Sequence, residues 1–338
     1  MSKVIVAMSG GVDSTMTAYL LKKQGYDVVG VSFIFYEDVS NNYLNSIKQN
    51  LEIIKISHYF VDLRKSFEEL IINPFYNAYK SGITPNPCVF CNRIMKFHNL
   101  LKEADRIGAD YISTGHYAII NNGMLYRGKD PLKDQSYSLY RLSLSQLKKV
   151  ILPLGYYHKS EIKDMASNLG LPCAKQSESQ EVCFLGGRGY HTFIKEYKEG
   201  NIINIHTNQK IGIHKGFFRY TIGQRRRIEA SSQVPLYVVD IDAEKNIIYV
   251  GNRELATSDT IKVSDINWID KKEQNFQATV KIRSTMKDQP AWVEFINQDE
   301  LIIKFQEPQW APAGGQSAVF YEGDKIIGGG IIKTQNRR

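Results

Sequence analysis

The feature that most constrains the fold is a glycine-rich turn at residues 9–14, with the sequence SGGVDS. It directly follows the short apolar run 4–8 and precedes a helical pattern at 15–24. A strand that passes through such a turn into a helix presents free backbone amides, which bind anions. The two glycines let the backbone come close to a phosphate, and the two serine hydroxyls add donors. The lysine of the GxxxxGK[ST] loop is absent, so a kinase or GTPase is not indicated.

Strand and helix patterns alternate through the first 195 residues. This alternation predicts an α/β fold with an open, doubly wound parallel sheet. The further predicted strands lie at 27–36, 58–62 and 110–114, and the further predicted helices at 40–55, 65–80, 92–107, 135–142, 145–151 and 160–169. We therefore assign residues 1–195 to a nucleotide-binding catalytic domain.

Short alternating strands replace this pattern after residue 195. About six regularly spaced strands between residues 261 and 333 predict a small closed barrel. Before them, strands are predicted at 202–206, 218–222, 236–240 and 247–250, with a hairpin turn at 243–246. The expected division is a β-rich central domain at 196–260 and a C-terminal β-barrel domain at 261–338.

The composition favours a nucleic acid partner. Lys and Arg number 43 against 35 Asp and Glu, which gives a formal net charge of +8, and the chain has 20 tyrosines whose rings can stack on bases. No apolar stretch approaches the roughly 20 residues that span a bilayer. The N-terminal apolar run is too short for a signal peptide, and four cysteines do not make a secreted disulfide framework. We expect a soluble cytoplasmic protein with no membrane partner.

Two cysteines lie close together in the segment TPNPCVFCN, where prolines stiffen an extended stretch before a helix. The helix N-terminus is expected to lower the pKa of the Cys91 thiol and make it a better nucleophile. The pair Cys88 and Cys91 is also typical of half a zinc site, for which Cys173, Cys183 and His98 are the candidate further ligands. Cys173 has no partner motif and is interpreted as an inert buried cysteine.

Motifs spread over essentially the whole chain carry a family resemblance. In order they are SGGVDS (9–14), NPCVFCN (86–92), TGHY (114–117), KDQSYSLY (133–140), VCF (182–184), TIGQR (221–225) and PAGGQSAVFY (312–321). The first resembles the PP-loop of enzymes that split ATP into AMP and pyrophosphate. Together they resemble the tRNA-specific 2-thiouridylase family.

The resemblance implies an ATP site with Mg²⁺ to neutralise the pyrophosphate. Asp13 is a candidate metal ligand or, alternatively, a cap of the following helix. Gly115 would allow close approach of the nucleotide, and Phe33 falls where the family usually has a methionine against adenine. The implied ATP-binding residues are Ala7, Met8, Ser9, Gly10, Gly11, Val12, Asp13, Ser14, Phe33 and Gly115.

The resemblance also implies the sulfur chemistry. In the family's usual form the cysteine matching Cys183 carries a persulfide from a sulfur donor, and the cysteine matching Cys91 is the nucleophile. A disulfide between the two remains until it is reduced, and one of their two loops is expected to move when tRNA binds. Many relatives have aspartate where this chain has Cys88. Cys88, Cys91 and Cys183 are therefore an alternative ligand set for a [4Fe–4S] cluster, which would need no persulfide.

The substrate implied is the wobble uridine 34 of the tRNAs for Glu, Gln and Lys, which must be flipped out of the anticodon stack. The β-rich half is expected to hold the anticodon arm. His116 is equally interpreted as a core histidine, and relatives often have a larger side chain at Ser284. The implied tRNA contacts are Asn86, Pro87, Cys88, His116, Lys133, Asp134, Gln135, Arg283, Ser284 and Gln316.

Two other functions remain open at this stage. The alternatives to a 2-thiouridylase are another PP-loop tRNA-modifying enzyme and a tRNA-binding protein with a regulatory ATP site. A small-molecule synthetase is disfavoured because it needs neither distant paired cysteines nor a basic β-rich tail. The sulfur donor, a desulfurase or a relay protein, the preferred tRNA and the oligomeric state are not encoded in any motif.

Overall fold

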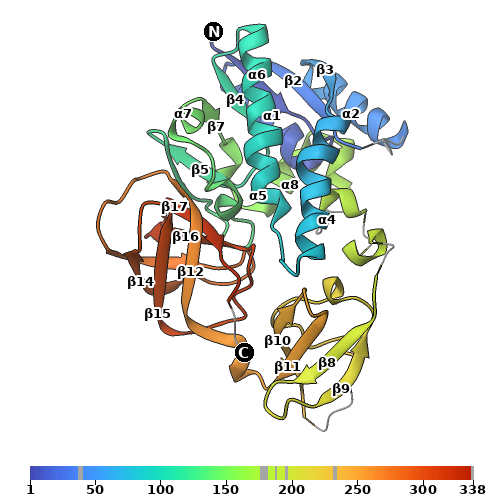
Figure 1. The fold of residues 1–338 in the computed structure, drawn as a ribbon. Helices are drawn as coiled ribbons and strands as arrows, with labels where there is room; N and C mark the ends of the chain where they lie inside the picture. The colour runs from blue at the N-terminus through green and yellow to red at the C-terminus, as the bar shows by residue number, and fades with distance from the viewer. Residues whose placement is uncertain (37–40, 176–181, 187–188, 195–196, 231–233, 336–338) are drawn as a thin grey trace.

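The computed structural model describes residues 1–338 except 37–40, 176–181, 187–188, 195–196, 231–233 and 336–338. Figure 1 shows an α/β part above two separate β-rich parts. Within the described residues, no helix is both long and apolar enough to cross a membrane.

The N-terminal part is built on a five-stranded sheet in the order β3-β2-β1-β4-β7. Every neighbouring pair is parallel, which confirms the predicted fold class. The strands are β1 (Lys3–Ala7), β2 (Asp27–Ile34), β3 (Ser57–Asp62), β4 (Tyr111–Ser113) and β7 (Val150–Ile151). Val4, Ile5 and Val6 of the central strand are completely buried because helices cover both faces of the sheet. The carboxyl ends of β1 and β4 lie side by side where the strand order reverses, and this is where such sheets bind ligands.

Helices follow most of the predicted positions. The glycine-rich turn leads into α1 (Val12–Lys23), and the other long helices are α2 (Asn41–Ile54), α4 (Asn73–Lys80), α6 (His98–Ile107) and α8 (Lys159–Asn168). Two predicted helices contain a π-helical turn that adds a residue to the turn. The first joins α3 (Arg64–Phe67), η1 (Glu68–Ile72) and α4, and the second joins α5 (Pro87–Phe90), η2 (Cys91–Phe97) and α6. The second therefore begins at Pro87, not at residue 92.

Two predictions of helix in this part are wrong. Residues 145–151 divide into α7 (Leu144–Leu147) and β7, because the β-branched pair Val150 and Ile151 pairs with β4 as the edge of the sheet. Residues 135–142 form only the short 3₁₀ turn η3 (Ser136–Leu139).

The middle part is a four-stranded sheet in the order β10-β11-β8-β9. Its strands are β8 (Gly200–Asn204), β9 (Lys210–His214), β10 (Tyr237–Asp242) and β11 (Ile247–Gly251). The predicted hairpin of the last two is confirmed. The predicted strand at 218–222 is wrong: η8 (Phe217–Arg219) is a 3₁₀ turn, because Phe218 is buried against Phe75 and Tyr79 of α4. β9 was not predicted.

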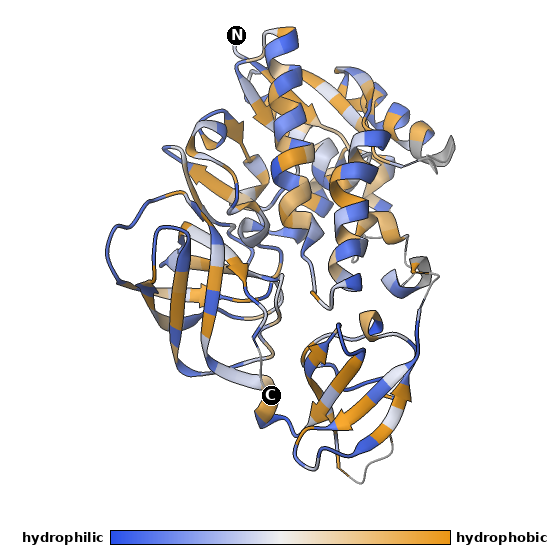
Figure 2. Cartoon of the chain, viewed as in Figure 1, coloured by the Kyte–Doolittle hydropathy of each residue, from blue (hydrophilic) through white to orange (hydrophobic). Residues whose placement is uncertain are grey.

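The C-terminal part is a closed six-stranded barrel, as predicted. Its strands are β12 (Thr257–Trp268), β13 (Phe276–Lys281), β14 (Gln289–Phe295), β15 (Glu300–Trp310), β16 (Ser317–Glu322) and β17 (Lys325–Ile332), and β12 pairs with β17 to close it. Hydrophobic and hydrophilic residues alternate along the barrel strands (Figure 2), as expected when one face of each strand lines the core. A hairpin of the α/β part, β5 (Ala118–Asn121) and β6 (Met124–Arg127), adds to the barrel sheet through β17.

Candidate active site

The glycine-rich turn is held in shape by its own serines. Gly10 has a positive φ of 75°, a conformation that glycine adopts without strain. The Ser9 amide donates to Ser14 Oγ at 3.1 Å, and Ser14 Oγ donates to the Gly11 carbonyl at 3.1 Å. Thr15 Oγ1 donates to the same carbonyl at 3.0 Å. The turn is therefore ordered at the N-terminus of α1, where the helix dipole favours a phosphate.

The other predicted ATP residues surround this turn. Ala7 ends β1 and Met8 follows it, buried, while Val12 begins α1. Phe33 is half-buried on β2, with its ring centroid 6.0 Å from that of Phe35. At Gly115 an added Cβ would lie 2.9 Å from the Ser14 amide nitrogen and from Asp13. A glycine is needed at this position because the segment after β4 packs closely against α1. The sequence analysis had given a different reason, the close approach of the nucleotide.

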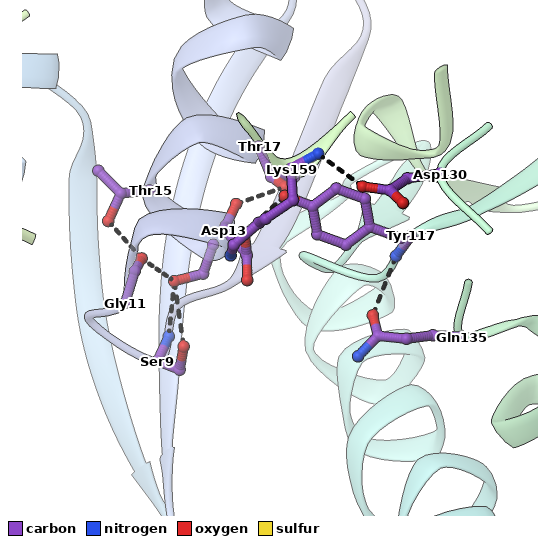
Figure 3. A network of polar contacts seen from close by, with 10 residues as sticks. Ser9, Gly11, Asp13, Thr15, Thr17, Tyr117, Asp130, Gln135 and Lys159 are labelled. Carbon is purple, nitrogen blue, oxygen red and sulfur yellow. Dashed lines mark hydrogen bonds and ion pairs between the residues drawn. The ribbon is translucent and has the colours of Figure 1, made fainter. Parts of the chain in front are cut away.

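An ion pair lies beside the turn (Figure 3). Asp13, the second residue of α1, has Oδ1 at 2.5 Å from Nζ of Lys159 and accepts a hydrogen bond from the Tyr117 hydroxyl at 2.8 Å. Lys159 begins α8 and is only 6% exposed, and its backbone amide donates to Asp130 at 3.0 Å. Gln135 Oε1 accepts from the Tyr117 amide at 3.0 Å. A buried ammonium group is thus fixed next to the anion-binding helix end.

Of the two predicted roles of Asp13, the structure excludes the helix cap. It does not cap α1, whose N-cap is Gly11 without a side-chain hydrogen bond. Among the described residues no group of three or more His, Cys, Asp or Glu side chains is placed to hold a metal ion. Mg²⁺ is commonly held by one or two carboxylates together with substrate phosphates, so Asp13 fits that role once Lys159 and Tyr117 release it. Bound Mg²⁺ would neutralise charge on the pyrophosphate.

The prediction that the helix N-terminus activates Cys91 is wrong. Because the helix begins at Pro87, Cys91 is its fifth residue, beyond the first turn where the dipole acts. Cys91 is 6% exposed and packs in an apolar cluster with Phe67 and Met95. Burial, together with the smaller contributions of Cys183 and Cys88, raises the pKa of its thiol to about 12. The thiol is therefore protonated at neutral pH.

Cys183 is exposed and lies within electrostatic range of Cys91. Its neighbour Phe184 places it there: the Phe184 ring contacts Phe67 at a centroid distance of 5.8 Å and Phe75 at 5.1 Å. Phe67 also stacks on Phe35 at 4.7 Å. A row of aromatic rings thus runs from β2 beside the phosphate turn to the Cys183 segment.

All four cysteines are free thiols, Cys88 and Cys183 exposed and the other two buried. Cys88, Cys91 and Cys183 influence one another electrostatically, yet in the described part of the chain they do not form a metal-binding group. Cys91 faces apolar side chains, so an iron–sulfur cluster or a zinc ion on these cysteines would require Cys91 to turn outward. Cys173 is completely buried in the core, which confirms that it is a buried cysteine.

Lys96, on the π turn η2, carries a positive charge that lowers the pKa of two of the thiols. Although Cys88 is exposed as a residue, loss of hydration at its thiol raises its pKa, as burial does for Cys91, and the charge of Lys96 opposes the rise in both. We expect alkylation of Cys91 by iodoacetamide to rise about tenfold per pH unit between pH 7 and 10, in line with the growing thiolate fraction. In Lys96→Met the rate should fall several-fold, because the loss of this charge leaves less of Cys91 as the thiolate. Peptide mass spectrometry measures the rate, and Lys102→Met, an exposed residue on α6, is the control. Equal rates in the wild type and Lys96→Met would contradict this role.

Comparison with known proteins agrees with these features. The families described as tRNA methyl transferase HUP domain, tRNA methyl transferase PRC-barrel domain and aminomethyltransferase beta-barrel domain match residues 2–187, 191–252 and 258–332. A tRNA-specific 2-thiouridylase MnmA of Caldanaerobacter subterraneus is 43% identical over 361 residues, covering 99% of both chains. The MnmA of Halothermothrix orenii is 42% identical over 356 residues, covering 98% of this chain and 99% of its own. The chain belongs to the tRNA-specific 2-thiouridylase family. Membership confirms the predicted enzyme class, a tRNA sulfurtransferase.

In this member of the 2-thiouridylase family, several residues predicted to contact tRNA are buried or form hydrogen bonds with other residues of the chain. His116 is 8% exposed, its Nδ1 lies 2.7 Å from Thr114 Oγ1, and burial lowers its pKa to about 3. It is thus a neutral core histidine, the second of its two interpretations. Asp134 accepts hydrogen bonds from the Gly128 and Ser136 amides, so its carboxylate shapes the loop that also contains Lys133.

The remaining tRNA candidates lie around the cysteine segment and the barrel. Asn86 hydrogen-bonds the Tyr137 hydroxyl, and the adjacent Pro87 is buried. Arg283 donates to two backbone carbonyls and Gln316 to two others, while Ser284 is exposed in a turn. Ser284, Cys88 and Gln135 are the exposed members of the predicted set.

The sequence interpretation of this 2-thiouridylase family member missed Lys159. The segment 145–151 was assigned to a helix, so the carboxyl end of β7, which leads towards α8, was not recognised as an edge of the ligand crevice. The pattern His158-Lys159-Ser160-Glu161 was the available signal, because the Glu161 carboxylate accepts from the His158 amide and starts the helix.

Proposed function

We propose that this protein uses ATP to thiolate C2 of the wobble uridine 34 in the tRNAs for Glu, Gln and Lys. The observation that supports this best is that one domain holds both a phosphate-binding turn and a pair of cysteines linked to it by packed side chains. A phosphate-binding turn with the buried Lys159 lies at the carboxyl end of β1. The cysteines Cys91 and Cys183 are connected to the neighbouring strand end through Phe35 and Phe67.

The first step activates the uridine oxygen. O2 attacks the α-phosphorus of ATP, the bond to the β-phosphate breaks, pyrophosphate leaves and the N3 proton is released. The turn at residues 9–14 binds the phosphates, and Lys159 donates to the departing pyrophosphate, whose negative charge grows as the bond breaks. Phe33 stacks on the adenine, as the family resemblance implies.

The second step delivers sulfur. A sulfur donor places a sulfane sulfur on Cys183 as a persulfide. The Cys91 thiol first loses its proton to solvent. As the thiolate it attacks Cys183 Sγ and expels hydrosulfide, which leaves a Cys91–Cys183 disulfide. Hydrosulfide then adds to C2, AMP leaves, and its proton ends on N3 of the 2-thiouridine. The two electrons that reduced the sulfane sulfur came from the two thiols, so an external dithiol must reduce the disulfide before the next cycle.

A second mechanism remains for the same function. Cys88, where many relatives have aspartate, would join Cys91 and Cys183 as ligands of a [4Fe–4S] cluster. In that form the cysteines hold the cluster and are not oxidised in turnover. The observation in its favour is the mutual electrostatic influence of the three thiols. It requires Cys91 to turn out of its apolar cluster.

The test measures 2-thiouridine in unmodified tRNA for Glu by mass spectrometry. The protein is incubated anaerobically with ATP, Mg²⁺, a sulfane-sulfur donor and a dithiol reductant, before and after removal of iron. We expect equal product in both samples because the persulfide route needs no iron. Loss of product with the iron and its return on cluster reconstitution would select the cluster route. No product under any condition, with ATP still bound, would favour a tRNA-binding protein with a regulatory ATP site.

In this proposal the domains divide at 195/196 and 260/261, the protein is cytoplasmic, and a desulfurase or a relay protein supplies the sulfur. The tRNA is contacted by Lys133, Asp134, Gln135, Arg283, Ser284 and Gln316.

A further inference from the structure

The segment before the cysteines is the point where the three parts of the chain meet. The Thr84 amide donates to the Gly314 carbonyl of the barrel part at 3.0 Å. Thr84 Oγ1 lies 2.5 Å from Oγ1 of Thr221, which belongs to the middle part. Gln316 Nε2 donates to the carbonyls of Thr84 and Pro85 at 3.0 and 3.2 Å. Residue 84 thus contacts both β-rich parts through polar groups.

The surrounding contacts leave little freedom at this junction. Gly315 has a φ of 91°, and an added Cβ would lie 2.3 Å from Ile83 Cγ2 and 2.9 Å from the Thr84 carbonyl oxygen. Arg283 Nη2 donates to the Ile222 carbonyl at 3.1 Å and to the Ala311 carbonyl at 2.8 Å, which joins the middle part to the barrel beside Thr84. The two β-rich parts are therefore fixed to one another where they hold this segment.

The connection from Thr84 to the cysteines is stiff. Pro85 and Pro87 each have a restricted φ, and Asn86 between them is the N-cap of α5. Cys88 and Cys91 follow within α5 and at the start of η2. A shift of Thr84 is consequently passed to the thiols and is not absorbed by a flexible linker.

We propose that Thr84 is a positioning residue that sets the cysteine segment relative to the two β-rich parts. The inference rests on the proposed function, in which those parts hold the anticodon arm while Cys91 and Cys183 deliver sulfur. Adenylation depends on the phosphate turn and Lys159, which lie outside this junction. Thr84 therefore controls sulfur transfer and leaves adenylation unaffected.

The experiment compares Thr84→Val, which removes the hydroxyl but retains the branched shape, with Thr84→Ser, which keeps the hydroxyl. We expect the rate of 2-thiouridine formation at saturating tRNA to fall about 10-fold or more in Thr84→Val, because small misplacements of reacting groups are costly. Transfer of labelled AMP from ATP to tRNA should stay within about twofold of the wild type. Thr84→Ser should restore thiolation. Thr221→Val should match Thr84→Val, and the double variant should be no worse than either, because one hydroxyl pair is lost in each case.

The control is Thr207→Val, an exposed threonine in a turn of the middle part, which should change neither rate. A Thr84→Val protein that thiolates like the wild type would overturn the inference. So would a parallel loss of both rates with a lower unfolding temperature, because that result describes a structural role only. If the wild type forms adenylated tRNA but never 2-thiouridine, the proposed function itself fails, and this outcome is distinguishable from the other two.

Discussion

Replacing Cys91 by serine should abolish 2-thiouridine formation and leave adenylation of the tRNA intact. The persulfide on Cys183 can release hydrosulfide only if a second thiolate attacks its Sγ, and serine is too weakly acidic to do so. Loss of a nucleophile of this kind costs on the order of 10³-fold or more in rate. Nucleoside mass spectrometry measures the product, and transfer of labelled AMP to tRNA measures the first step.

Cys88→Ser is the matched control. Cys88 is exposed and takes no part in the persulfide chemistry, and serine keeps its size at the predicted tRNA contact, so this variant should thiolate like the wild type. If Cys88→Ser is as inactive as Cys91→Ser, the three cysteines act as a set and the cluster route replaces the persulfide route. If Cys91→Ser retains full thiolation, both routes fail.

Replacing Lys159 by methionine should have the largest effect on the ATP half-reaction. The ammonium group is buried beside the phosphate turn, and removing one such preorganised donor costs roughly 10²–10³-fold. We therefore expect kcat/KM for ATP in adenylation to fall by that factor. In a direct calorimetric titration the affinity for a non-hydrolysable ATP analogue should also fall. Lys159→Arg keeps the charge and should recover part of both.

Folding must be separated from function here, because Lys159→Met leaves Asp13 without its cation. The double variant Asp13→Asn with Lys159→Met removes both charges, and it should regain the wild-type unfolding temperature without regaining ATP affinity. Lys129→Met is the control. Lys129 forms a surface ion pair at 3.4 Å with Glu161, which lies on α8 like Lys159. Wild-type ATP affinity in the double variant would show that Lys159 only compensates Asp13.

Local patterns predicted most elements of the fold because the residues that specify each element lie within it. The buried run Val4–Val6 and the glycine turn after it required nothing from elsewhere. Two elements were predicted wrongly because their structure depends on residues far away in the sequence. Residues 150–151 became a strand because β4 was beside them, and residues 217–219 became a 3₁₀ turn because α4 offered an apolar pocket to Phe218. Neither partner is near in sequence.

The candidate site was predictable to the same extent. Residue types and spacing identified the phosphate turn and the cysteines, since chemistry restricts which side chains can do those tasks. The electrostatic state of the site was not predictable. The sequence suggested a lowered pKa for Cys91, but packing against Phe67 and Met95 raises it, and that packing depends on where the π turn places the thiol.

The sequence by itself determined the strand–turn–helix that binds phosphate, the pair of sulfur-bearing segments and the change from an α/β part to β-rich parts, because each is specified by neighbouring residues. Only the tertiary structure decided which distant groups meet. Lys159 reaches Asp13 across 146 residues, and Thr84 meets Thr221 across 137 and Gln316 across 232. Such contacts are set by how strands order in a sheet and how domains dock, and no local pattern of residues carries that information.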